Sequence, residues 1–163
     1  MHIFIKNKKL SIGNYNVKCA IGKRGITSNK LEGDKCTPRG RFKFKYVFYR
    51  KERNKNIRSK LKIIPIKKNF GWCDDVKSKY YNKFITFPFK HSAERLYIKQ
   101  NIYDIIVVLD YNCKPIKKNK GSAIFLHVAR RKYSPTLGCI AMSKNDLKYL
   151  LSVISKKTFL KIL

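Results

Sequence analysis

The sequence predicts a mainly β fold with one packed C-terminal helix and long connecting loops. Short apolar stretches such as Phe42–Phe48 alternate with period two, which is typical of half-buried strands. Glycine- and proline-bearing segments separate these stretches, and only one segment, near the C-terminus, has the apolar spacing of a helix. The 163 residues, of which 44% are hydrophobic, fit one domain spanning 1–163 with a substantial core.

The expected strands can be followed in chain order. Met1–Ile5 and Leu10–Ile21 are predicted to form a first hairpin, with Gly13 and Asn14 offering a turn. Residues 22–40 contain four glycines and are expected to be a long loop. The Lys/Arg-rich segment 49–62 is interpreted as a solvated connection. Further strands are expected at Phe42–Phe48, Lys62–Ile66, Phe84–Phe87, Tyr103–Tyr111, Ser122–Val128 and Thr158–Leu163.

Two segments are more specific. The run from Tyr103 to Leu109 is almost wholly apolar, so we expect it to be central and buried. A helix should begin after Ser143, which can cap it together with Asp146 at the third position. Its apolar stripe is Leu147, Leu150, Leu151 and Ile154. These features fit a β-sandwich or a closed β-sheet with one helix packed on it.

Cys139 and His127 form the most informative pair in the sequence. Cys139 follows Gly138 in a turn, twelve positions after His127, which ends the apolar run from Ser122. A cysteine thiolate is a strong nucleophile, and a neighbouring imidazole can take the thiol proton. The glycine allows a sharp turn that exposes backbone N–H groups to a developing oxyanion. A lone histidine is usually a core residue, but this Gly-Cys turn favours catalysis.

The residues from His127 to Thr136-x-Gly138-Cys139-Ile140-x-Met142 resemble the signature of the L,D-transpeptidase catalytic domain (the YkuD-like family of cell-wall enzymes). An upstream segment, Glu32-Gly33-Asp34-x-x-Thr37-Pro38-x-Gly40-x-Phe42, is similar to the Thr-Pro-x-Gly segment of that domain. Two matches in the right order are more specific than either alone. The resemblance implies the YkuD-like β-sandwich fold.

The chain departs from the common family pattern at two positions. Val128 stands where the family has a glycine after the motif histidine, and Ala141 stands where it has an arginine two residues after the cysteine. Arg130 and Arg131 are candidate replacements for that arginine, and they could hold substrate carboxylates through bidentate contacts.

The resemblance implies a transferase acting on peptidoglycan stem peptides, with Cys139 as nucleophile and His127 as base. An acyl-enzyme would pass to an amine, giving a cross-link, or to water, giving L,D-carboxypeptidase activity. Backbone amides at Leu137, Gly138 and Cys139 would stabilise the oxyanion. The reaction needs no metal or cofactor, and carbapenem β-lactams are the implied inhibitors.

The sequence allows either a role in the site or a purely structural role for several other residues. Thr136 either lines the site or forms a turn. Tyr133 is a candidate substrate contact and Tyr103 a packing residue. Asp74 and Asp75 either bind a substrate ammonium or cap a turn beside Trp72. Glu32 and Asp34 are best explained as part of an ordered loop that edges the cleft.

The formal net charge of +30, from 39 Lys and Arg against 9 Asp and Glu, allows a nucleic-acid-binding alternative. The lysines are scattered, however, and no nucleic-acid-binding motif is present, so we expect no nucleic-acid partner. The charge would also favour anionic wall polymer or a membrane surface. A third alternative is an inactive wall-binding module.

The five cysteines are widely spaced and none of them forms a C-x-x-C pair, so the sequence indicates neither a zinc ribbon nor a thioredoxin-like dithiol site. The four besides Cys139 are expected to be inert thiols. The resemblance places the protein in the cell envelope or periplasm. The N-terminal apolar stretch is too short for a signal-peptide core and no transmembrane segment is expected, which leaves a cytoplasmic location open.

Overall fold

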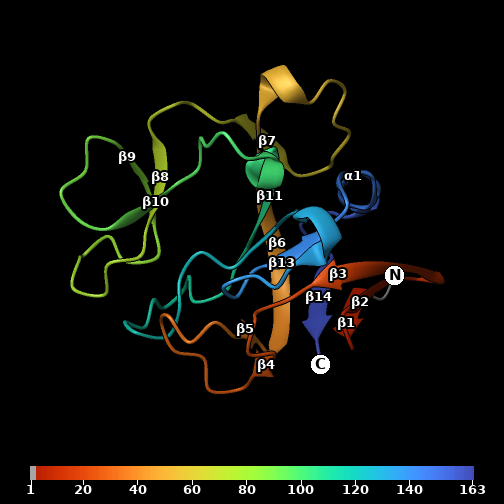
Figure 1. Cartoon of the computed structure of the whole chain (residues 1–163), viewed down its shortest axis with the longest axis horizontal. Helices are drawn as coiled ribbons and strands as arrows, with labels where there is room; N and C mark the ends of the chain where they lie inside the picture. The colour runs from red at the N-terminus through yellow and green to blue at the C-terminus, as the bar shows by residue number, and fades with distance from the viewer. Residues whose placement is uncertain (1–2) are drawn as a thin grey trace.

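The computed structural model describes residues 3–163 and is mainly β, with one α-helix in that range (Figure 1). The strands are β1 (Ile3–Lys6), β2 (Lys9–Ile12), β3 (Tyr15–Ala20), β4 (Ile26–Thr27), β5 (Thr37–Pro38), β6 (Gly40–Tyr49), β7 (Lys62–Pro65), β8 (Phe70–Cys73), β9 (Phe84–Thr86), β10 (Ala93–Arg95), β11 (Ile105–Leu109), β12 (Phe125–Val128), β13 (Ile140–Met142) and β14 (Phe159–Ile162). The helix α1 spans Lys144–Val153, and short 3-10 turns lie at Lys51–Arg53, Asn101–Tyr103 and Arg131–Tyr133.

Nine strands form the main sheet, in the order β11-β12-β13-β3-β2-β1-β14-β6-β7. The long strand β6 pairs with β14 through its first residues and with both β11 and β7 through its last ones. Because β11 also pairs with β12, the sheet returns on itself, and every strand of it except β7 belongs to a closed circuit of paired strands.

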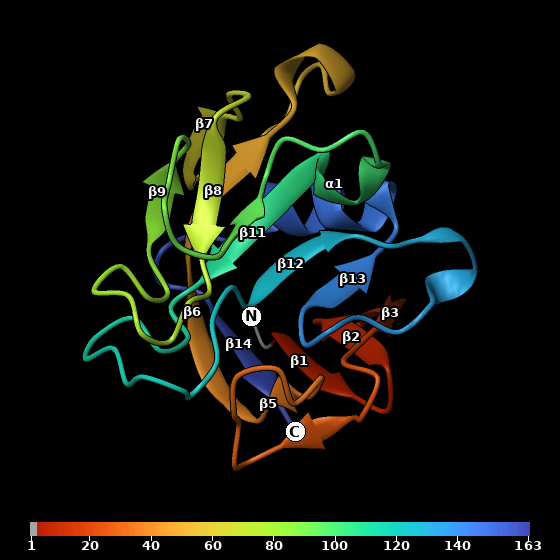
Figure 2. The same cartoon turned by 60° about the vertical axis from the view of Figure 1, so that its left-hand side comes forward.

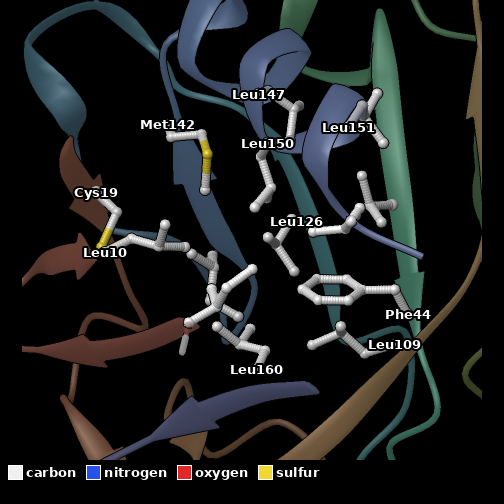
Figure 3. Close-up of a cluster of buried hydrophobic side chains, with 14 of the residues drawn as sticks. Leu10, Cys19, Phe44, Leu109, Leu126, Met142, Leu147, Leu150, Leu151 and Leu160 are labelled. Carbon is white, nitrogen blue, oxygen red and sulfur yellow. The ribbon is translucent and has the colours of Figure 1, made fainter. Parts of the chain in front are cut away.

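The larger core fills the space between this sheet and α1. Leu147, Leu150 and Leu151 on the helix pack against strand side chains such as Leu126 and Met142 (Figure 3). Ser143 caps the helix, since its side chain accepts a hydrogen bond from the Asp146 N–H at 3.1 Å. The predicted helix, cap and apolar stripe are therefore confirmed.

A second core lies on the opposite face of β11 and β12, under the small sheet β10-β8-β9 (Figures 1 and 2). Trp72 of β8 packs edge-on against Phe125 of β12, with ring centroids 5.1 Å apart. Strand β11 is thus buried on both faces, which explains its continuous apolar run and confirms that it is central.

Several sequence expectations need refinement. The strand expected at Leu10–Ile21 is two strands, β2 and β3, separated by the Gly13–Asn14 turn, while Met1 in the first expected strand lies outside the described residues. Strands β4, β5, β8, β10 and β13 were not anticipated, because each has only two to four residues and lacks clear alternation. The first two lie within the segment 22–40, which was expected to be a loop throughout.

The interpretation of 49–62 as a solvated connection is wrong at Arg50 and Asn54, which are 5% and 3% exposed. Arg50 donates to the Ile98 carbonyl at 2.6 Å, and Asn54 donates to the Asp104 carbonyl at 2.9 Å. These hydrogen bonds link the segment 49–62 to the residues around β11. Its high content of basic residues therefore did not mean that every residue in it is exposed to solvent.

Candidate active site

Adjacent parallel strands place Cys139 and His127 on one face of the main sheet. In the β12–β13 ladder Leu126 is opposite Ile140, and His127 is opposite Ala141. Leu126 and Ile140 point into the larger core, so His127 and Ala141 point the other way. Cys139, two residues before Ala141, faces the same side, toward the second core.

Both side chains line one cavity of about 560 Å³. Among the other residues predicted for the site, Thr136, Leu137, Gly138 and Arg130 also line it. Arg131 and Tyr133 are not part of its lining. They lie in the 3-10 turn between β12 and β13, where the Tyr133 ring is 4.9 Å from the Lys18 Nζ.

The Cys139 thiol is held by two backbone groups. Its S–H donates to the Ala123 carbonyl at 3.1 Å, and the Phe125 N–H donates to the sulfur at 3.4 Å. Burial, and next the negative charge of Glu94, raise the pKa of the thiol to about 12, while the Phe125 N–H and Lys30 lower it. The resting cysteine is therefore a protonated thiol.

Ala123 owes its position to the segment that follows β8. It adopts a left-handed backbone conformation (φ +51°), which non-glycine residues rarely do. Its N–H donates to the Asn82 Oδ1 at 3.1 Å, and the same oxygen accepts from the Trp72 indole at 2.9 Å. The small sheet thus supports the carbonyl that orients the thiol.

The His127 ring has a defined tautomer. Its Nδ1 lies 2.9 Å from the Val128 carbonyl, which can only accept, so Nδ1 carries the proton and Nε2 keeps its lone pair. Burial, and to a lesser extent the positive charge of Arg130, lower the pKa of His127 to about 4, against the opposing effect of the Val128 carbonyl. The ring is neutral at physiological pH and packs edge-on against Tyr103.

The upstream Thr-Pro motif anchors the cysteine turn. The Thr37 hydroxyl donates to the Gly138 carbonyl at 2.8 Å and accepts from the Gly22 N–H at 2.8 Å. Gly138 has φ +145°, and a Cβ there would lie 2.9 Å from the Cys36 carbonyl oxygen, so only glycine fits without rearrangement. The two motifs recognised in the sequence therefore meet in space.

Thr136 closes the turn around Cys139. Its hydroxyl donates to the Cys139 carbonyl at 2.6 Å and accepts from the Gly138 N–H at 3.1 Å. The Gly138 N–H is consequently occupied and is not an open oxyanion donor in this conformation. Within residues 3–163, the N–H groups of Leu137 and Cys139 donate no hydrogen bond.

The loop 31–36 edges the cavity, as expected from the sequence. Asp34 orders it by accepting from the Leu31 and Cys36 N–H groups, both at 2.8 Å, while Glu32, Gly33 and Lys35 line the cavity. Of the two interpretations given for Asp74 and Asp75, a position in the site fits Asp74 and a turn cap fits Asp75. Asp74 lines the cavity, and Asp75 caps a turn by accepting from the Lys77 N–H at 2.8 Å.

Tyr103 and Glu94 are among the cavity residues that sequence reasoning missed. Tyr103 was expected only to pack, yet its hydroxyl donates to Glu94, and both line the cavity. Glu94 follows no motif, and only the pairing of β10 with β8 brings it to the site. No pattern in the sequence marks either residue.

The thiol, the neutral imidazole and the open backbone N–H groups are the components of acyl transfer through a thioester. Within residues 3–163, no three His, Cys, Asp or Glu side chains are grouped so that they could hold a metal ion. No helix in that range has the length and apolar character needed to cross a membrane.

Comparison with known proteins gave one family match. A search of curated proteins and a search of solved structures each found no match. The family model YkuD, described as the L,D-transpeptidase catalytic domain, matches residues 2–162. Because this match spans nearly the whole chain, the protein belongs to the L,D-transpeptidase catalytic domain family.

Proposed function

We propose that the protein is a cysteine-dependent L,D-transpeptidase that acts on peptidoglycan stem peptides through an acyl-enzyme on Cys139. The observation that carries this proposal is the shared cavity, in which a backbone-held thiol and an imidazole with an unprotonated Nε2 lie on the same sheet face. The family match supports an enzyme of this class.

In the first half-reaction, the Cys139 sulfur attacks the carbonyl at the L-centre of the third stem residue. The C–S bond forms, the C–N bond to the terminal D-amino acid breaks, and a thioester remains. His127 takes the thiol proton on Nε2 and gives it to the leaving amine. In the second half-reaction, an amine from another stem attacks the thioester, His127 accepts its proton, and the thiol is restored.

The resting protonation states support general-base catalysis over a preformed ion pair. The pKa of the Cys139 thiol is about 12, and that of His127 is about 4. A standing thiolate–imidazolium pair is therefore unfavourable, and the proton moves to His127 as the sulfur attacks. With water as the second nucleophile, the same machinery gives L,D-carboxypeptidase activity.

Two other features of the site have roles in this mechanism. The Leu137 and Cys139 N–H groups are the proposed oxyanion donors, each worth ~3 kcal/mol in comparable sites. Arg130 lines the cavity where the family arginine is replaced by Ala141, so we assign it, and not Arg131, to a substrate carboxylate. We further propose that the enzyme works in the cell envelope or periplasm, where this substrate lies.

Carbapenem labelling tests the nucleophile. The intact protein should gain the mass of one carbapenem, and the Cys139→Ser variant should gain none. Cys113→Ser removes a half-buried thiol outside the cavity and serves as the matched control, which should label like the wild type. Labelling that persists in Cys139→Ser, or that maps to another cysteine, would overturn the assignment.

The products distinguish the possible activities. Mass spectrometry of muropeptides incubated with the protein should show cross-linked stems, or stems shortened by one D-amino acid if water is the acceptor. Peptidoglycan binding without any product would identify an inactive wall-binding module. Nucleic-acid affinity that falls steeply with salt and survives Cys139→Ser, with muropeptides unchanged, would favour the nucleic-acid alternative.

A further inference from the structure

A second concave surface lies on the small sheet, outside the cavity of Cys139. It is a groove of about 570 Å³, lined by side chains between residues 80 and 91. The described residues that line it are different from those that line the cavity. Strand β9, which supplies part of the lining, is an edge strand of the small sheet and lies at the periphery of the molecule, away from β1, β2 and β3 (Figures 1 and 2). The volume is that of a ligand site, roughly 300–1,000 Å³.

Aromatic rings line this surface, which we call the aromatic groove, and they are Tyr80, Phe84, Phe89 and His91. The Phe89 ring lies between two others, with its centroid 5.8 Å from that of Tyr80 and 5.4 Å from that of His91. Phe84 stacks on Phe48 at 5.6 Å. Tyr80 and Phe84 are nevertheless 41% and 37% exposed. Large aromatic side chains that are exposed together in a concave surface indicate a binding site.

The groove also has polar groups with unused hydrogen-bonding capacity. The Nδ1 atom of His91 lies 3.1 Å from the Asp75 Oδ2, which accepts its proton, so the ring is held and Nε2 is left for a ligand. Within residues 3–163, this Nε2 and the hydroxyls of Tyr80 and Thr86 make no hydrogen bond. Apolar rings with a few well-placed polar groups are the composition of a ligand site.

The charge around the groove is positive. The segment 76–93 contains no Asp or Glu, and the acid just before it, Asp75, is paired with His91. Lys90 lines the groove, and the Lys79 Nζ lies 5.3 Å from the centroid of the Tyr80 ring. The exposed lysines of the segment are Lys77, Lys79, Lys83 and Lys90. The complementary partner therefore has flat apolar faces, hydrogen-bonding edges and negative charge.

We propose that the aromatic groove binds sugar rings of the glycan strand to which the stem peptides are attached. This inference rests on the proposed function and extends it from the stem to the polymer. The C–H groups on the face of a sugar ring favour the negative face of an aromatic ring, and the hydroxyls at its edge match the free groups of Tyr80, Thr86 and His91. Carboxylates of the stems along the strand supply the negative charge that complements the lysines.

The small sheet connects the groove to the cavity. Trp72 of β8 is opposite Phe84, which lines the groove, and also opposite Glu94, which lines the cavity. Neighbouring strands lie about 4.8 Å apart, so β9 and β10 are separated by roughly 10 Å. Three to four extended residues reach about 10–14 Å. A strand seated in the groove can therefore direct one of its stems toward Cys139.

Stem-free sugar tests the groove without turnover. Oligomers of β-1,4-linked N-acetylglucosamine should bind the wild type in isothermal titration calorimetry. Tyr80→Leu, which removes the ring, should weaken binding about tenfold, and Tyr80→Phe should lose less. Tyr149→Leu is the matched control, because Tyr149 is 44% exposed on α1 and lies outside the groove. No binding by the wild type, or equal weakening in Tyr80→Leu and Tyr149→Leu, would overturn the proposal.

A measurement on the unaltered chain gives an independent answer. When the same oligomer is added to ¹⁵N-labelled wild type, amide chemical shifts should change mainly within residues 80–91 and not in α1. Shift changes confined to residues 136–139 would place the sugar in the cavity and reject the groove. Binding of single-stranded DNA or of anionic lipid vesicles at residues 80–91, with no response to the sugar, would replace the glycan by that partner.

The lysines are tested with glycan strands that retain their stems, in the Cys139→Ser protein so that no turnover occurs. Lys90→Gln should weaken binding of these strands about threefold and leave binding of the stem-free oligomer unchanged. Lys157→Gln, at an exposed lysine outside the groove, should have no effect on either ligand. Equal effects of the two lysine variants would show that the strand does not lie along the groove.

Kinetics separate this inference from the proposed function. Tyr80→Leu should raise the KM for stems attached to glycan strands about tenfold, while the KM for a free stem tetrapeptide and the rate of carbapenem labelling stay unchanged. Equal KM values for glycan-linked stems in the variant and the wild type would reject the groove and leave the transpeptidase intact. Sugar binding without turnover of any stem would count against the proposed function and leave the groove standing.

Discussion

At the residue scale, the protonation states of two side chains decide how the site can work. Burial makes the Cys139 thiol a weak acid and the His127 imidazole a weak base, with pKa values of about 12 and about 4. Both groups are neutral in the resting protein. In the proposed mechanism the thiol proton therefore moves to the imidazole only as the sulfur attacks.

The lowered pKa of His127 has a consequence for stability. An unfolded histidine titrates at ~6.5, and the native one titrates at about 4. Between these values the unfolded chain binds a proton that the native protein does not. The neutral His127 therefore contributes to the free energy of unfolding in full above pH ~6.5, and this contribution is lost as the pH falls through about 4.

We therefore expect the melting temperature of the wild type to fall more steeply than that of His127→Gln as the pH is lowered across this window. Thermal unfolding followed by circular dichroism measures the difference. His91→Gln, at an imidazole outside the cavity, should keep the steep fall. Parallel curves for the wild type and His127→Gln would contradict a neutral, buried imidazole.

At the element scale, short strands and loops distant in sequence position Cys139, the proposed nucleophile. Thr37 of β5 holds the Gly138 carbonyl, and Asn82, which follows β8, holds Ala123, the acceptor of the thiol hydrogen bond. Neither segment belongs to β12, which carries the His127 imidazole, or to β13, which begins directly after Cys139. The geometry at Cys139 thus depends on contacts from loops and from the small sheet.

Thr37→Val tests this dependence, because valine keeps the shape of threonine but loses both hydrogen bonds of its buried hydroxyl. The variant should be less stable by about 1–3 kcal/mol in denaturant unfolding and should be acylated more slowly by a carbapenem. Thr27→Val is the matched control, since in the described part of the chain (3–163) the Thr27 hydroxyl accepts only from the exposed Asn29 N–H. Equal behaviour of the two variants would show that the Thr37 hydroxyl does not hold the turn.

At the scale of the whole molecule, the charge of +30 is a cost to the folded state. Compact folding brings like charges together, and salt screens their repulsion. The same charge attracts anionic polymers over long range, which is consistent with a wall substrate.

The stability of the protein should accordingly rise with ionic strength. Between about 10 mM and about 150 mM salt, the Debye length falls from roughly 30 Å to about 8 Å. We expect the melting temperature to increase across this range, as measured by scanning calorimetry in sodium chloride. A flat or falling melting temperature would mean that the surface charges are already compensated.

Much of the fold could be predicted from the sequence because local patterns determine it. The alternation of Phe42–Phe48, the apolar run before Leu109 and the stripe after the Ser143 cap each correspond to an element of the structure. The proposed nucleophile and base could also be picked out, since a thiol after glycine and a preceding histidine form a motif. Each of these features is local in the sequence, the longest being the twelve positions from His127 to Cys139, so residue chemistry and periodicity are sufficient to find it.

Only the tertiary structure could reveal how these parts meet. The contact of Thr37 with Gly138 spans 101 residues, and Tyr103 and Glu94 reach the cavity through strand pairings that no periodicity announces. Protonation likewise depends on burial and on charges contributed by remote segments. The sequence by itself determined the chemical groups and most of the local elements. The tertiary structure, through the closed main sheet and the small sheet packed on it, decided which of those groups share one buried cavity.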